Sequence, residues 1–242
     1  MSFPFVAALT PKDVMTASTS KKHPLGTLGM LPDGRTYRYC KAGAAILRPE
    51  WGAYNANEHL TACTGESSEA DCEPDAAVGD ETVTILDTAT RAVNYYADGY
   101  LVSFDVPGQI IGIVSSTAGA GTSVTLTLET PLTSVITGTC NIYPSPWGNI
   151  KSAYTYQNAN WHPIMCVPPC AVANGSYFWG QIKGPCWITP NSWPMDAEYE
   201  HDLCFVTDGS IAPKATASAK QHAGRMISGG NYGDAFLMLE LE

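Results

Sequence analysis

Charged residues are scarce in this chain. Asp, Glu, Lys and Arg together make up 15% of its 242 residues, whereas a soluble domain usually carries about 25%. Uncharged polar side chains and tyrosines must therefore cover much of the surface. Surfaces of this kind are common where one protein meets another. An ordinary secreted β protein is the alternative that this composition leaves open.

Basic residues are the scarcer of the two charged classes. The chain has 13 Lys and Arg against 23 Asp and Glu, which gives a net charge of -10. Proteins that bind nucleic acid cluster Lys and Arg to neutralise phosphates, but the tightest basic pair here is Lys21-Lys22. We therefore expect no nucleic-acid partner.

Long apolar runs are also missing. The longest, such as residues 109–115, have the length of a strand rather than of a membrane span. The opening sequence MSFPFVAALTPKD has no basic segment and no long apolar core, so it does not resemble a signal peptide. These absences predict no membrane partner, and synthesis and folding in a cytoplasm.

Sustained helical periodicity is absent, and short strand-like segments take its place. Residues 123–129 (SVTLTLE) alternate between polar and apolar side chains, which is typical of a strand. Similar segments recur between turns rich in glycine and proline. This spacing predicts a mainly β fold, with one or more β-sandwich or barrel domains, an extended N-terminal arm and little helix. The main expected strands cover residues 82–86, 100–106, 109–115, 123–129, 135–143, 177–182, 201–206 and 235–241.

The composition along the chain predicts three regions. We expect residues 1–30 to form the extended arm, because they lack a hydrophobic period and contain helix-breaking prolines. Residues 31–149 are expected to form a β-rich domain with an acidic loop at 49–80. Residues 150–242 are expected to form a second β-rich subdomain.

The start of the second region predicts a hairpin. Pro32-Asp33-Gly34 is a turn sequence, since proline presets the first backbone angle and glycine accepts a positive one. We expect this turn to join residues 28–30 to a strand that begins at Arg35.

Cysteine and histidine are the candidate metal ligands. His162, Cys166, Cys170 and Cys186 have ligand chemistry that zinc prefers, but prolines hold this segment extended and spread residues four apart by roughly 13 Å. We expect no metal site. Most of the eight cysteines are instead expected to be reduced and buried, and Cys63 and Cys72 are the best candidates for a disulfide.

The sequence also contains no recognisable catalytic motif. His201 and Asp202 are neighbours in an expected strand, so their side chains point to opposite faces, and no G-x-S-x-G nucleophile motif is present. Asp196, Glu198 and Glu200 alternate and could line one face as the acids of a glycoside hydrolase. A solvated acidic edge that discourages aggregation is the interpretation we favour. We expect no catalytic residue, no cofactor and no enzymatic activity.

Several short motifs together resemble a known family. They are Leu25-Gly26-Thr27, Asp33-Gly34-Arg35, Tyr37-Arg38-Tyr39 and Ala42-Gly43, followed by Asp98-Gly99-Tyr100 and by Tyr177-Phe178-Trp179-Gly180-Gln181. In this order they resemble the capsid decoration (cement) proteins and related capsid-associated structural proteins of tailed bacteriophages.

The resemblance implies a non-catalytic virion protein. Such a protein binds the outside of an icosahedral capsid, contacts the major capsid protein and stabilises the shell, often as a homotrimer, after assembly in the host cytoplasm. We expect the arm and the first hairpin to make these contacts, and removal of residues 2–24 to weaken attachment while leaving the core folded. The expected interface residues are Phe3, Phe5, Leu9, Leu25, Arg35, Tyr37, Arg38 and Tyr39.

Two other functions stay open at this point. A carbohydrate-binding or glycan-hydrolysing β protein of a phage tail or a secreted particle could stack Trp179 or Trp187 on a sugar. A head–tail or tail-tube component is the other possibility, and it too would be an assembly protein.

Overall fold

A computed structural model shows a mainly β protein, which confirms the predicted fold class. Among the described residues, two short helices, α1 (Pro11–Val14) and α2 (Ala153–Tyr156), accompany the strands, and no helix there is long and apolar enough to cross a membrane. The structure describes residues 6–57, 76–121, 123–137, 140–156, 162–191, 201–214, 221–228 and 236–242.

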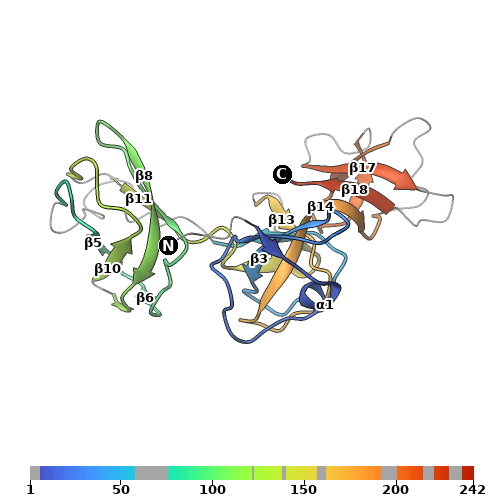
Figure 1. Cartoon of the computed structure of the whole chain (residues 1–242), viewed down its shortest axis with the longest axis horizontal. Helices are drawn as coiled ribbons and strands as arrows, with labels where there is room; N and C mark the ends of the chain where they lie inside the picture. Colours follow the sequence, from blue (N-terminus) through green and yellow to red (C-terminus); the bar gives the residue numbers. More distant parts are fainter. Residues whose placement is uncertain are drawn as a thin grey trace. The chain divides into compact units, whose positions relative to one another are not determined.

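The chain divides into two compact units (Figure 1). Unit 1 comprises residues 1–56 and 147–242, and unit 2 comprises residues 57–146. This differs from the three predicted regions, because the first and last parts of the chain share one sheet. Long-range strand pairing decides the division, and local sequence patterns carry no information about it.

Unit 1 is built on an eight-stranded sheet. Within it, β3 (Thr36–Lys41) pairs antiparallel with β14 (Tyr177–Trp187), and Figure 1 draws these strands in blue and orange. A three-stranded sheet in the same unit has the order β12 (Ile150–Ser152), β4 (Ala53–Asn55), β13 (Ile164–Cys166). The large sheet has the order β1 (Ala7–Ala8), β2 (Leu28–Met30), β3, β14, β18 (Phe236–Glu240), β17 (His222–Ser228), β15 (Asp202–Phe205), β16 (Ile211–Pro213).

The predicted first hairpin is present. Strands β2 and β3 pair antiparallel, with Met30 opposite Thr36. Gly34 adopts a φ of 89°, a left-handed conformation that glycine accepts without steric cost, and its amide donates to the Leu31 carbonyl oxygen at 3.0 Å.

The described part of the N-terminal segment is packed into unit 1, which corrects the prediction of an extended arm. Strand β1 runs parallel to β2. The Thr10 and Asp13 side chains each bond the other residue's backbone amide, which caps α1 as a capping box. Leu9 and Val14 are 7% and 3% exposed, so burial of apolar surface holds the segment in place.

The two faces of the β3–β14 pair bury different residues, because side chains alternate along a strand. Tyr37, Tyr39 and Trp179 belong to one cluster, together with Leu9 and Val14. The opposite face buries a second cluster, which includes Cys40, Phe178 and Ile182.

Unit 2 is an antiparallel five-stranded sheet with one buried face. Alternation places Leu101, Ile111 and Leu126 in its core and turns Tyr100 and Ile110 outward, 46% and 72% exposed. A separate pair is formed by β6 (Thr90–Arg91) and β9 (Gly119–Ala120). The sheet order is β11 (Cys140–Tyr143), β7 (Tyr100–Ser103), β8 (Gln109–Ser116), β10 (Ser123–Leu128), β5 (Thr82–Leu86).

Candidate functional site

Three of the expected interface residues lie inside unit 1. Leu9, Tyr37 and Tyr39 are 7%, 0% and 2% exposed. Their side chains pack on their own chain, so they offer almost no surface to a partner, and this part of the prediction is corrected. The resemblance does not distinguish the two environments, because cores and interfaces both use aromatic residues. Phe3 and Phe5 lie outside the described residues.

The remaining three interface candidates are partly exposed. Leu25 packs against the edge of the tyrosine and tryptophan cluster. Arg35 pairs with Asp33, with 2.8 Å between Nε and a carboxylate oxygen. Arg38 pairs with Glu242 at 2.6 Å and donates to the Gly26 carbonyl oxygen at 2.9 Å. Both arginines are therefore already engaged within unit 1.

The candidate metal ligands do not form a site. Cys166 is buried in the second cluster together with Cys40, whereas Cys186 belongs to a different core cluster. Nowhere in the described ranges do three or more His, Cys, Asp or Glu side chains come close enough to hold a metal ion. Cys63 and Cys72 fall outside those ranges.

Of the candidate catalytic residues, His201 and Asp202 are the ones that the structure describes. Asp202 faces Arg225 across β15 and β17, with 3.4 Å between the carboxylate oxygen and Nε. Asp196, Glu198 and Glu200 lie outside the described residues, so the predicted acidic edge has no structural description.

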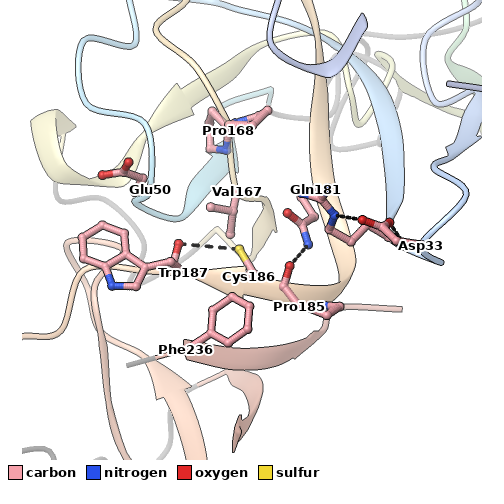
Figure 2. Close-up of a pocket in the computed structure, with 11 residues that line it drawn as sticks. Asp33, Glu50, Val167, Pro168, Gln181, Pro185, Cys186, Trp187 and Phe236 are labelled. Atoms are coloured by element: carbon pink, nitrogen blue, oxygen red, sulfur yellow. Dashed lines mark hydrogen bonds and ion pairs between the residues drawn. The ribbon is translucent and has the colours of Figure 1, made fainter. Parts of the chain in front are cut away.

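Unit 1 contains a pocket of about 420 Å³ (Figure 2). Trp187 and Phe236 are a cross-strand pair of β14 and β18 and are 37% and 39% exposed. In Figure 2, Trp187 and Glu50 lie at one end of the pocket and Asp33 lies at the other. The lining residues are Asp33, Arg35, Glu50, Val167, Pro168, Pro169, Gln181, Pro185, Cys186, Trp187 and Phe236.

Backbone carbonyl groups hold two of the polar residues that line the pocket, Gln181 and Glu50. The Gln181 side-chain amide donates to the Pro185 carbonyl oxygen at 2.9 Å. Glu50 has a left-handed φ of 73°, and its amide donates to the Pro168 carbonyl oxygen at 3.1 Å. This backbone hydrogen bond fixes the position of Glu50 in the pocket lining. It also holds Glu50 in a left-handed conformation, which is unfavourable for residues with a side chain.

Two buried groups next to the pocket are poor acid–base or nucleophilic groups. Burial raises the pKa of the Cys186 thiol to about 12, so the reactive thiolate is rare at neutral pH. Burial also raises the pKa of Tyr37 to about 12. The Tyr37 hydroxyl has no hydrogen-bond partner of good geometry in the described part of the chain. Both groups therefore stay protonated at neutral pH.

Sequence reasoning identified Trp187 but missed the pocket. Its walls come from five separate stretches of chain, around residues 33–35, 50, 167–169, 181–187 and 236. The β14–β18 pairing and the turn after β2 bring these stretches together. No sequence motif within any one stretch predicts that they meet. Trp179, the other tryptophan proposed to stack on sugar, is 5% exposed and belongs to the core.

The formal charge of the chain is unevenly divided between the units. Residues 57–146 contain twelve Asp and Glu but a single basic residue, Arg91, whereas the rest of the chain contains eleven Asp and Glu and twelve Lys and Arg. Arg91 is itself paired with the buried Asp87, with 2.8 Å between Nε and a carboxylate oxygen. The acidity of the protein thus belongs to unit 2.

Large apolar side chains are exposed on both units. Val106, Leu47 and Ile110 are the most exposed, at 98%, 79% and 72%. Single exposed apolar residues are ordinary, but groups of them on one surface mark contact sites. Those with at least half of their surface exposed are Leu47, Met15 and Ile227 in unit 1, and Val78, Val93, Phe104, Val106 and Ile110 in unit 2.

Comparison with known proteins gives no relative. No protein-family model, no curated protein sequence and no solved structure matches this chain.

Proposed function

We propose that this protein is a structural component of a virion that binds the outside of an icosahedral phage capsid and stabilises it. The observation that carries the proposal is the set of exposed large apolar side chains on a β scaffold with few charges, which suits a protein built to be bound. A cement protein needs contact surface rather than chemistry, because a partner that binds only the assembled shell stabilises it by mass action.

The pairing of β3 with β14 adds support from the fold. Two of the motifs that resemble decoration proteins, Tyr37-Arg38-Tyr39 and the Tyr177–Gln181 segment, lie side by side in the eight-stranded sheet of unit 1. Most of the large side chains in these motifs are buried in the core of unit 1. The motifs are therefore suited to stabilising the fold. The contacts with the capsid are then made by other residues, which are exposed, and not by the tyrosines of the first hairpin.

Imaging the particle by cryo-EM tests the proposal. We expect density for this chain on the outer face of the shell, in threefold-related copies, next to the major capsid protein. Density at the neck or along the tail would replace the proposal with a head–tail or tail component. A particle without the chain would overturn any virion role.

The pocket supports a second candidate function, binding of carbohydrate. Trp187 is exposed at the pocket with Glu50 and Asp33 in the same lining, and sugars bind to aromatic faces flanked by carboxylates through stacking and hydrogen bonds. A glycan array with the purified protein tests this candidate. Specific binding that is lost in Trp187→Ala but kept in Trp51→Ala, an aromatic control outside the pocket lining, would favour it over the capsid role.

A further inference from the structure

The loop between β7 and β8 gathers exposed apolar side chains at one place. Phe104 and Val106 lie in the loop and are 54% and 98% exposed, and Ile110, next to it on β8, is 72% exposed. Val135 is 43% exposed and lies in the segment of residues 133–137 that is hydrogen-bonded to this loop. We call these four residues the apolar tip.

Hydrogen bonds from polar side chains fix the conformation of the loop that carries the apolar tip. The Asp105 carboxylate accepts from the Thr137 amide at 2.9 Å. The Gln109 side chain accepts from the Thr133 amide at 3.0 Å and donates to the Ser134 carbonyl oxygen at 2.8 Å. The Ser134 hydroxyl donates to the Pro107 carbonyl oxygen at 3.0 Å. A loop fixed in this way loses little conformational freedom when it binds.

The charge of unit 2 limits what the apolar tip can meet. Its single basic residue, Arg91, is engaged by Asp87 and also lies over the Tyr95 ring, 4.5 Å from its centroid. An acidic unit repels phosphate backbones and anionic lipid headgroups, and it also repels unit 2 of a second copy. Complementary charge favours a partner whose surface is basic around the contact.

We propose that the apolar tip is a docking element that inserts Phe104 and Val106 into an apolar pocket of a protein partner whose rim carries Lys and Arg. Within the proposed function, on which this inference rests, the partner is a protein subunit of the shell. The tip supplies the buried centre of the contact, where a few side chains dominate the binding energy, and the net negative charge of unit 2 supplies long-range attraction.

Binding of the full-length protein to purified shells that lack it tests the inference. The test variant is Phe104→Ser with Val106→Ser. The matched control is Val93→Ser, which changes another exposed valine of unit 2 that is 63% exposed. Thermal melting checks that all three proteins are folded. We expect the tip variant to lose at least tenfold in affinity, the control to stay within twofold, and binding of the wild type to weaken as salt rises.

The possible failures are distinguishable. If the wild type does not bind shells, the proposed function falls and this inference falls with it. If the wild type and the tip variant bind shells equally, only the inference is overturned. It is also overturned if the tip substitutions abolish binding to vesicles of phosphatidylcholine and phosphatidylglycerol, or abolish self-association in sedimentation velocity, since lipid or a second copy would then be the occupant.

Discussion

Tyr39 and Trp179 face each other across β3 and β14, with their ring centroids 5.0 Å apart. They are 2% and 5% exposed. His23 contacts both rings, and Tyr177 stacks on Tyr39 with centroids 5.9 Å apart. Residues that are distant in the sequence therefore form one aromatic cluster, and this cluster joins the N-terminal and C-terminal parts of unit 1.

Trp179 is predicted to be essential for the stability of unit 1. Replacing a buried tryptophan by alanine removes apolar burial and leaves a cavity, so Trp179→Ala should lower the free energy of unfolding by about 3–5 kcal/mol. Trp187→Ala is the matched control, since Trp187 is partly exposed, and it should cost less than about 1 kcal/mol. Urea denaturation measures both values, and equal losses would contradict the assignment of Trp179 to the core.

Leu9 tests whether the N-terminal segment belongs to the folded unit. Leu9→Ala should cost about 2–5 kcal/mol, because the side chain is buried against the tyrosine and tryptophan cluster. Met15→Ala, at a position that is 58% exposed, should change stability by less than about 1 kcal/mol. Hydrogen exchange should show the loss in unit 1. An unchanged melting temperature for Leu9→Ala would contradict the burial of the N-terminal segment in unit 1.

The same packing changes the expectation for removal of residues 2–24. That deletion takes away β1, α1 and the buried Leu9 and Val14. We now expect it to destabilise unit 1 rather than to leave its core folded, so weaker capsid attachment by the deletion would not by itself identify the interface. Circular dichroism on the truncated chain checks this, and native-like melting would contradict it.

Asp87 links the stability of unit 2 to pH. Burial by itself raises the pKa of this carboxyl, but hydrogen bonds from Tyr96, Arg91 and the Ala89 amide outweigh burial and bring the pKa below the usual 3.8. The Tyr96 hydroxyl donates to the carboxylate at 2.5 Å, and the side chain is 1% exposed. The folded state therefore favours the charged form, and this contribution is present above the unfolded pKa and lost as pH falls through the folded pKa.

Asp87→Asn measures that contribution. At pH 7 the variant should be less stable by about 2–3 kcal/mol, because a charged hydrogen-bond acceptor is replaced by a neutral one. The difference between wild type and variant should shrink as pH falls below 3.8. Denaturant titrations at several pH values check this, with Asp80→Asn, at an exposed position, as the control. A difference that is independent of pH would contradict the charged state of Asp87.

Cysteine reactivity should follow burial. Cys170 is partly exposed, whereas the other described cysteines, Cys186 among them, are buried. Burial raises the pKa of both thiols, to about 12 for Cys186. Iodoacetamide at pH 8 with peptide mass spectrometry should label Cys170 at least tenfold faster than Cys186, and urea should abolish the difference. Equal labelling of the folded protein would show that the core opens readily.

Local sequence patterns predict the strands and turns that depend on alternation or on turn residues within one short segment. Alternation in residues 123–129 corresponds to β10, and the Pro32-Asp33-Gly34 turn joins β2 to β3. Both depend on interactions between residues close in the sequence: side chains alternate along any strand, and turn residues act through their own backbone angles. The same patterns could not tell whether Tyr37 and Tyr39 face a partner or a core, because both environments favour aromatic residues.

The sequence by itself determined the mainly β class and the uneven distribution of charge, since these follow from composition and from the two-residue period of a strand. Only the tertiary structure decided that residues 57–146 form a unit of their own, that Leu9 and Trp179 share a core, and that Trp187 lines a pocket with Phe236. The physical reason is that burial is a property of long-range contacts. A side chain becomes core or surface according to which distant strand pairs with its own, and no local propensity records that choice.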